Sequence, residues 1–208
     1  MLGGTFDPVH NGHLRFAEEA RRRLELDAVA LVPAGVPVHR PAARATGDQR
    51  RAMLDAAVRG RGGIHVDGRE LAGNRPGWTI DTLASFRDES EARPLCLLLG
   101  ADQLEVLDTW RRWRELTDYA HLVVARRTGA KSPRDGEVSR WAQARRCEDA
   151  ALLHTRPSGS ILVMDLPAVD ISSTAVRARC ASGEDLAGLV PDAVAQYIRQ
   201  EKLYSDGA

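Results

Sequence analysis

The order of apolar and amphipathic segments constrains the fold of this chain more than any other feature. Short runs rich in Val, Ile and Leu alternate with longer stretches of helical periodicity. We expect strands at 28–32, 64–66, 95–99, 122–125 and 161–164. Continuous apolar runs of this length are typical of strands that are buried on both faces of a parallel sheet. The alternation therefore predicts an α/β fold with a doubly wound, mainly parallel sheet.

Helices are expected between these strands and after the last one. They cover about 12–26, 47–59, 79–88, 102–108, 134–146, 172–182 and 191–202. The last helix is expected to begin with Pro191 in its first position and to bury Val194, Tyr197 and Ile198. The final two would form a small C-terminal helical cap. With no repeat or linker visible, we expect a single domain over 1–208, with a core over about 1–170 and a helical part over about 171–208.

The composition argues against several classes of protein. Lys and Arg together number 29, as do Asp and Glu, so no net field would draw the chain to nucleic acid or to an anionic membrane. No apolar run approaches the roughly 20 residues that span a bilayer. The three cysteines, Cys96, Cys147 and Cys180, form no Cys-x-x-Cys pair, which favours a reducing cytoplasm. Any binding of phosphate must therefore depend on local groups.

The most informative stretch is a loop that leads into a helix, Gly3-Gly4-Thr5-Phe6-Asp7-Pro8-Val9-His10-Asn11-Gly12-His13. Glycines let the backbone come close to a ligand, and the first amides of a helix favour phosphate, as does the positive end of its dipole. His10 and His13 are three residues apart, so both rings can donate hydrogen bonds to the same phosphate oxygens. Gly12 between them leaves room for the phosphates. Such a site would stabilise the charge on a leaving pyrophosphate.

This stretch also has simpler interpretations. In isolation, Gly-Gly followed by Asp-Pro is more often a structural turn. Two histidines near a helix start also occur as a metal pair or as surface residues. No Cys or Glu stands at metal spacing nearby, so we expect no metal ion held by protein side chains.

A second helix start lies far along the chain, in Asp170-Ile171-Ser172-Ser173-Thr174-Ala175-Val176-Arg177. Its hydroxyls and the planar donor fork of Arg177 can bind a polyphosphate. Taken alone, the segment is more simply explained by a serine N-cap and an arginine that points to water. In a doubly wound sheet, however, the two helix starts would meet at the carboxyl edge of the strands, where such folds bind ligands.

Together and in this order, the two segments resemble the nucleotidyltransferase superfamily of adenylyl- and cytidylyltransferases, which implies a Rossmann-like sheet. Segments between them resemble the bacterial nicotinate-nucleotide adenylyltransferases in particular, so that the resemblance runs over nearly the whole chain. These segments are Val32-Pro33-Ala34-Gly35-Val36-Pro37-Val38-His39-Arg40, Trp78-Thr79-Ile80-Asp81-Thr82-Leu83, Leu99-Gly100-Ala101-Asp102, Thr109-Trp110-Arg111-Arg112-Trp113, Leu189-Val190-Pro191-Asp192, Tyr197-Ile198 and Leu203-Tyr204.

The resemblance implies two sets of binding residues. The set for ATP is Gly3, Gly4, Thr5, Phe6, His10, Gly12, His13, Ile171, Ser172, Ser173 and Arg177, with His10, His13 and Arg177 catalytic. The set for the acceptor is Trp78, Thr79, Asp102, Trp110 and Arg111. Trp110 would stack on a pyridine ring, and the backbone amides of Thr79 and Arg111 would receive a nicotinate carboxylate. Asp102 would lie near the ribose and the metal region, and His39 and Arg40 would approach the phosphates.

Each of these roles has a plainer alternative. Trp110 and Trp113 are three residues apart and can both be core packing, which is the commoner position of tryptophans at helical spacing. Asp102 can be a helix cap. His39 and Arg40 can be solvated residues of the long loop expected over 33–46.

The activity implied by the resemblance is transfer of AMP from ATP to nicotinate mononucleotide, giving nicotinate adenine dinucleotide (deamido-NAD) and pyrophosphate, with Mg²⁺ carried by ATP. One alternative is an adenylyltransferase for nicotinamide mononucleotide or another phosphorylated acceptor. A second is a non-catalytic nucleotide-binding module. Only Met1 and Leu2 precede Gly3 where family members usually carry a short strand, so either the first central strand is truncated or the true start lies upstream. Either a monomer or a homo-oligomer is compatible with the sequence.

Overall fold

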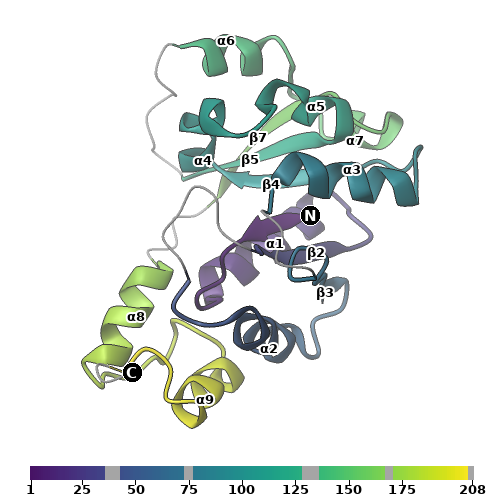
Figure 1. The fold of residues 1–208 in the computed structure, drawn as a ribbon. Coiled ribbons are helices and arrows are strands. Elements are labelled where there is room, and N and C mark those ends of the chain that lie inside the picture. Colours follow the sequence, from purple (N-terminus) through teal and green to yellow (C-terminus); the bar gives the residue numbers. More distant parts are fainter. Residues whose placement is uncertain (36–42, 73–76, 128–135, 167–170, 206–208) are drawn as a thin grey trace. The chain divides into compact units, whose positions relative to one another are not determined.

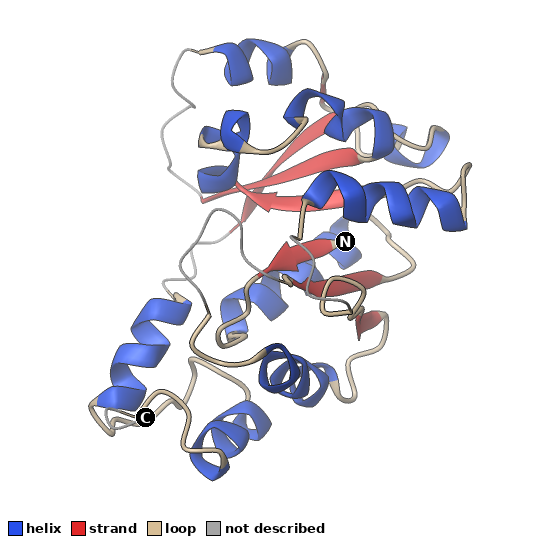
Figure 2. Ribbon diagram, in the orientation of Figure 1, coloured by secondary structure: helices blue, strands red, loops and turns tan. Residues whose placement is uncertain are grey.

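The computed structural model describes residues 1–35, 43–72, 77–127, 136–166 and 171–205 (Figure 1). The chain forms two compact units. Unit 1 comprises Met1–Gly3 and Gly77–Ala168, and unit 2 comprises Gly4–Pro76 and Val169–Ala208. The described strands follow the order β3-β2-β1-β4-β5-β7-β6, and non-consecutive neighbours mark the crossovers of a doubly wound α/β fold. Both units contain helices and strands (Figure 2). The predicted single domain with a C-terminal helical part stays a prediction.

Unit 1 contains four strands that pair in parallel. These are β4 (Cys96–Gly100), β5 (His121–Arg127), β6 (Arg146–Cys147) and β7 (Ile161–Leu166). Its helices are α3 (Thr79–Glu89), α4 (Ala101–Glu105), η1 (Leu107–Thr109), η2 (Trp113–Glu115), α5 (Leu116–Tyr119), α6 (Glu137–Gln143) and α7 (Leu152–Thr155). The apolar runs of β4 and β5 are buried from Cys96 to Leu99 and from His121 to Val124, as expected of strands covered on both faces.

Unit 2 contains β2 (Val29–Pro33) and β3 (Ile64–Val66), which pair in parallel. Its helices are α1 (Asn11–Arg23), α2 (Gly47–Val58), α8 (Ser173–Ala181) and α9 (Asp192–Gln200), and α9 packs against α2. The first strand, β1 (Leu2–Gly4), has three residues. It crosses from unit 1 to unit 2 at Gly4, where the loop to α1 begins.

Local capping fixes where α2 begins. The Thr46 hydroxyl accepts a hydrogen bond from the Gln49 amide at 3.2 Å, and the Gln49 side chain accepts one from the Thr46 amide at 2.9 Å. This reciprocal pair is a capping box, which satisfies two donors at the helix start. The cap holds the first turn of α2, and Arg50 in that turn reaches the loop that follows β1.

The structure corrects several predicted boundaries. The helix predicted to run to Arg146 ends at Gln143, and Arg146 lies in β6, because it pairs with Ile161, the first residue of β7, whose amide donates to the Arg145 carbonyl. The helix predicted over 102–108 divides into α4 and η1. Pro191 is the N-cap of α9 and not its first residue, and Tyr197 is only partly buried. Within the described ranges, no helix is both long enough and apolar enough to cross a membrane.

Candidate functional site

The loop between β1 and α1 is held through its backbone carbonyls. The Gly4 carbonyl accepts the Ala34 amide at 2.8 Å, just after β2 ends. The Thr5 carbonyl accepts Arg50 Nη1, also at 2.8 Å. Two neighbouring elements of unit 2, β2 and α2, therefore fix the path of this glycine-containing segment.

Phe6 lies in this loop with a left-handed backbone conformation (φ 51°), which non-glycine residues seldom adopt. Its buried ring lies so close to Gly4 that a Cβ there would be 3.2 Å from the ring. The same ring makes an edge contact with His13, with the centroids 4.9 Å apart. Gly4 thus leaves space for a phenylalanine that supports a predicted catalytic histidine.

His10 and His13 are adjacent at the start of α1. Their rings stack with centroids 3.6 Å apart, as the spacing of three residues allows. His10 is the N-cap and is 6% exposed. Burial lowers the pKa of His10 to about 4, so the ring is neutral at pH 7. Gly12 lies between the two histidines in the first turn.

The hydrogen bonds of this pair indicate its tautomers. His13 Nδ1 accepts the His10 backbone amide at 3.2 Å, so a neutral His13 carries its proton on Nε2. His10 Nδ1 is buried and has no hydrogen-bond partner among the described residues. In the capping-box arrangement at the start of α1, the His10 side chain faces the backbone amide of His13, which can only donate, so Nε2–H is also favoured in His10. Both rings therefore offer an Nε2–H donor when they are neutral.

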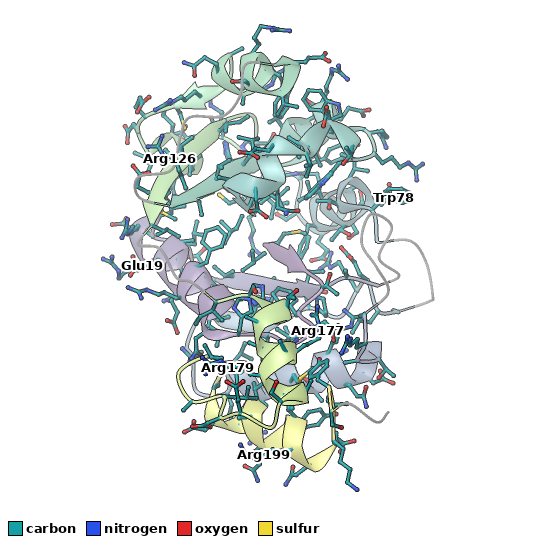
Figure 3. The ribbon with its side chains drawn as sticks, turned by 90° about the vertical axis from the view of Figure 1, so that its left-hand side faces the viewer. Glu19, Trp78, Arg126, Arg177, Arg179 and Arg199 are labelled. Carbon is teal, nitrogen blue, oxygen red and sulfur yellow. The ribbon has the colours of Figure 1, made fainter. Side chains whose placement is uncertain are left out.

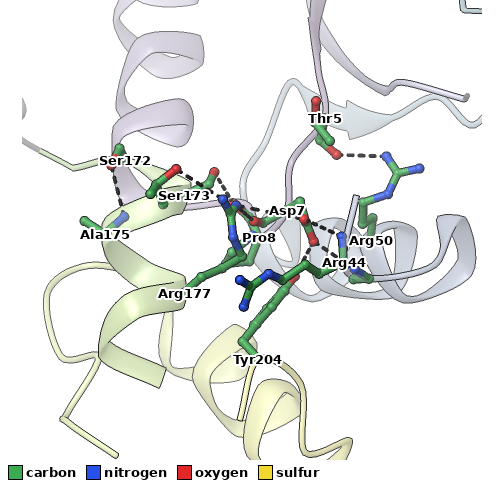
Figure 4. A network of polar contacts seen from close by, with 12 residues as sticks. Thr5, Asp7, Pro8, Arg44, Arg50, Ser172, Ser173, Ala175, Arg177 and Tyr204 are labelled. Atoms are coloured by element: carbon green, nitrogen blue, oxygen red, sulfur yellow. Dashed lines mark hydrogen bonds and ion pairs between the residues drawn. The ribbon is translucent and has the colours of Figure 1, made fainter. Parts of the chain in front are cut away.

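The start of α8 contacts this loop, as the topology predicted. Ser173 Oγ donates to the Pro8 carbonyl at 2.9 Å, and Arg177 Nη1 donates to the Asp7 carbonyl at 2.6 Å (Figure 4). Arg177 lies one turn into the helix (Figure 3). The segments are far apart in sequence, and both belong to unit 2.

Two other residues of this segment have local positions. Ser172 is the N-cap of α8, and its Oγ accepts the Ala175 amide at 3.1 Å. The sequence allowed Ser172 to be an N-cap or a phosphate-binding residue, and the structure shows that it is an N-cap. Ile171 precedes it and is partly buried. Arg177 Nη2 donates to the Thr174 hydroxyl at 3.1 Å, which restrains the guanidinium from a second side.

The sequence does not reveal the role of the Asp7 carboxyl group, because the pattern around it indicates only an Asp-Pro turn. Asp7 is 5% exposed. Its Oδ2 accepts the Arg44 amide at 2.8 Å, and its Oδ1 accepts the Ala45 amide at 3.1 Å and the Tyr204 hydroxyl at 2.7 Å (Figure 4). A carboxylate in a glycine-containing loop was the available signal, but its partners come from distant parts of the sequence.

In unit 1, the structure brings together most of the predicted acceptor residues. Trp78 is the N-cap of α3, and Thr79 is its first residue, where backbone amides have no partner within the helix. The Arg111 guanidinium lies over the Trp78 ring, 5.6 Å from its centroid. Arg111 is also 3.7 Å from Asp81, which lies in the first turn of α3. The 78–79 and 110–111 segments are therefore neighbours.

The two tryptophans predicted at helical spacing differ. Trp113 is buried and makes an edge contact with Trp141, with centroids 5.0 Å apart, so it is a core residue. Trp110 is only partly buried and is the C-cap of η1. Packing thus accounts for one of the pair and leaves the other available to a ligand.

The remaining predicted residues, where the structure describes them, make no side-chain hydrogen bond or ion pair with these groups. Gly3 is an exposed residue of β1. Asp102 is exposed in the first turn of α4, where its carboxylate accepts the Gln103 amide group at 2.7 Å. His39 and Arg40 lie outside the described residues. Among the residues that are described, no three or more His, Cys, Asp or Glu side chains are arranged to hold a metal ion.

Comparison with known proteins gives the family. The cytidylyltransferase-like family model matches residues 1–179. An Aeromonas hydrophila protein named "probable nicotinate-nucleotide adenylyltransferase" is 46% identical over 98% of this chain and 95% of its own length. A Yersinia enterocolitica protein of the same name is 42% identical over 98% of this chain and 94% of its own length. The chain belongs to the nicotinate-nucleotide adenylyltransferase family.

A solved structure supports the fold of this nicotinate-nucleotide adenylyltransferase family member. The nicotinic acid mononucleotide adenylyltransferase of Plasmodium falciparum, complexed with NaAD, superimposes with a TM-score of 0.74. The match covers 98% of this chain and 95% of that one at 15% identity, so it bears on the fold alone. The predicted Rossmann-like α/β sheet is thereby confirmed.

Proposed function

We propose that this chain transfers AMP from ATP to nicotinate mononucleotide, releasing pyrophosphate and forming nicotinate adenine dinucleotide. The observation that carries the proposal is the contact of Arg177 and Ser173 with the loop that leads into the histidine pair. It gathers a helix N-terminus, two imidazole donors and a guanidinium in one unit. These groups suit a triphosphate, because each offers a donor or a positive potential to phosphate oxygens.

The proposed chemistry is a direct, in-line displacement. The 5′-phosphate oxygen of the acceptor forms a bond to the α-phosphorus of ATP while the bond to the pyrophosphate oxygen breaks. A phosphate monoester is already nucleophilic near neutral pH, so the protein mainly aligns the reactants and stabilises developing charge. The Nε2–H groups of His10 and His13 and the fork of Arg177 would donate to the triphosphate, and Ser173 holds the loop beside them.

For the acceptor, the support comes from unit 1. A partly exposed Trp110 offers an aromatic face, and the first turn of α3 at Thr79 offers backbone amides. An amide donor suits the carboxylate of nicotinate better than a carboxamide, which brings its own donors. The Asp81 carboxylate is paired with Arg111, which reduces its repulsion of a bound anion.

The setting of the reaction is part of the same proposal. Mg²⁺ would arrive with ATP as part of the substrate. The three cysteines are free thiols, which is consistent with a reducing cytoplasm.

Release of pyrophosphate is the test. The purified protein is incubated with Mg-ATP alone, with nicotinate mononucleotide added, and with nicotinamide mononucleotide added. We expect release with nicotinate mononucleotide, a much lower rate with the nicotinamide compound, and none with ATP alone. A preference for nicotinamide mononucleotide would reassign the acceptor. Nucleotide binding without release under every condition would identify a non-catalytic module.

A further inference from the structure

We propose that Tyr204 is a positioning residue for the triphosphate site, acting through the carboxyl group of Asp7. The inference rests on the proposed function of that site. It follows from a hydrogen bond that joins residues 197 positions apart, between the Tyr204 hydroxyl and Asp7 Oδ1 at 2.7 Å. Both residues belong to unit 2.

The backbone around Tyr204 is shaped to deliver this side chain. After α9 the chain reverses, and the Leu203 amide donates to the Ile198 carbonyl at 3.0 Å. Lys202 and Tyr204 both have left-handed backbones, with φ of 52° and 63°. Such conformations cost free energy in non-glycine residues and persist where the surroundings require them. The ring is 6% exposed, so a buried contact has been formed at a conformational cost.

Tyr204 can act only as a donor in this contact. Burial, and then the hydrogen bond to Asp7, raise the pKa of Tyr204 far above its usual value, so the hydroxyl keeps its proton. The two Asp7 oxygens also accept the Arg44 and Ala45 amides. The carboxyl group thus connects three segments: the loop before α1, the approach to α2, and the chain after α9.

This arrangement affects the arginine that is proposed to bind ATP. Arg177 Nη1 donates to the Asp7 carbonyl and lies 3.9 Å from Asp7 Oδ2. Asp7 therefore competes with a triphosphate for the same guanidinium. The hydroxyl of Tyr204 and the two amides satisfy the carboxylate, which weakens its attraction for Arg177. Without the hydroxyl, we expect Arg177 to be held by Asp7 and the loop to lose a restraint.

The test compares Tyr204→Phe with Tyr197→Phe. Tyr197 lies on α9 in the same unit, and its hydroxyl forms no hydrogen bond with another described residue. Calorimetry measures the Kd for Mg-ATP, and steady-state assays measure KM separately for ATP and for nicotinate mononucleotide. In Tyr204→Phe we expect Mg-ATP to bind about tenfold more weakly, the order expected for loss of one charge-assisted hydrogen bond. The KM for ATP should rise, and that for the acceptor should not change.

Other outcomes would overturn the proposal. If the Tyr204 hydroxyl stabilises only the fold, Tyr204→Phe melts at a lower temperature while both KM values stay at the wild-type level. An equal effect in Tyr197→Phe would show that the hydroxyl contact is not responsible. Asp7→Asn gives a second test that keeps the side-chain size. It removes the negative charge that competes for Arg177, so it should not weaken Mg-ATP binding as Tyr204→Phe does. In that background Tyr204→Phe should change the Kd far less than in the wild type, because its effect acts through the charge of Asp7. Full additivity would exclude action through Asp7.

The same experiment separates this inference from the proposed function. If the wild type releases no pyrophosphate with nicotinate mononucleotide, the proposed reaction is wrong. The calorimetric Kd values for Mg-ATP would still decide whether Tyr204 positions the site. If the wild type is active and Tyr204→Phe binds Mg-ATP normally, the reaction stands and the positioning role does not.

Discussion

His10 and His13 lie three residues apart at the start of α1, but their surroundings differ. His10 is buried with an unpaired Nδ1, whereas His13 uses Nδ1 to accept the His10 amide. His13 therefore has both a structural atom and a proposed donor, Nε2–H. The two roles can be separated by substitution, because asparagine can retain an acceptor near Nδ1 without reaching the position of Nε2.

We predict that His13→Asn keeps the fold and loses most of the activity. Its kcat should fall about 100-fold to 1,000-fold, as when one donor to a transition-state oxyanion is removed. Gln, which reaches further and carries an amide donor, should retain more activity than Asn. His65→Asn is the matched control, since His65 is exposed on β3. Circular dichroism checks the fold, and unaltered turnover in His13→Asn would remove His13 from the mechanism.

The tryptophans of unit 1 provide a second comparison at this scale. Trp110→Ala should raise the KM for nicotinate mononucleotide, because loss of aromatic stacking on a base costs about 1–3 kcal/mol. Trp113→Ala should instead lower the free energy of unfolding by about 3–5 kcal/mol, because Trp113 is buried against Trp141. Steady-state kinetics and urea unfolding of both variants check this. The reverse pattern would make Trp110 the packing residue.

At the scale of elements, the sequence predicts best where burial leaves a pattern. The strand predicted at 64–66 is observed there as β3, and the other predicted strands lie within a few residues of β2, β4, β5 and β7. The two-residue β6 and the single-turn α5 and α7 were not predicted. Elements this short depend on tertiary contacts and carry too little periodicity to be recognised.

In the candidate site, the sequence identifies residues whose role depends on local position and misses those whose role depends on contacts between distant parts of the chain. The donors at the two helix starts, such as His13 and Arg177, were identified because residue type and position suffice for them. Asp7 and Tyr204 were not assigned a contact, because their pairing depends on how the chain returns after α9. The left-handed backbone of Phe6 was also unpredicted, since no glycine marks it.

Arg87 holds several elements of unit 1 together. Its guanidinium donates to five backbone carbonyls, those of Ser90, Glu91, Arg93, Tyr119 and Pro157. These lie after α3, at the end of α5 and before β7. Removing the donors would take away these hydrogen bonds, although the Pro157 carbonyl would still accept the Leu95 amide at 3.1 Å.

We therefore predict that Arg87→Met lowers the free energy of unfolding by about 2–3 kcal/mol, since the methionine fills part of the space but donates nothing. Arg93→Met is the control, because the Arg93 side chain is exposed and only its carbonyl takes part. Urea unfolding measures both. A loss in Arg87→Met no larger than that in Arg93→Met would show that water replaces these bonds without cost.

At the scale of the whole molecule, each unit contains a buried histidine that is neutral in the folded state. His10 is in unit 2, and His121 is in unit 1. His121 Nε2 contacts the Arg156 carbonyl at 2.9 Å, and its Nδ1 accepts the Ser160 amide at 3.1 Å, which fixes the neutral Nε2–H tautomer. Burial lowers the pKa of His121, as it lowers that of His10 to about 4.

Both shifts have the same sign in their effect on stability. Below the unfolded-state pKa of about 6.5, the unfolded chain binds protons that the folded chain does not, so folding becomes less favourable as pH falls. For His10 the loss begins near pH 6.5 and continues to about pH 4. Between pH 7 and pH 5 it amounts to about 2 kcal/mol.

We predict that urea unfolding midpoints fall steeply from pH 7 to pH 5 in the wild type and less steeply in His10→Gln and in His121→Gln, because glutamine does not titrate. His65→Gln should follow the wild type, since His65 is exposed on β3. Measurements are made without nucleotide, because a bound triphosphate would favour protonation of His10 and so hide its unfavourable burial. Parallel curves for the wild type, His10→Gln and His121→Gln would mean that neither ring is kept neutral by the fold, and the tautomers assigned from their hydrogen bonds would have to be reconsidered.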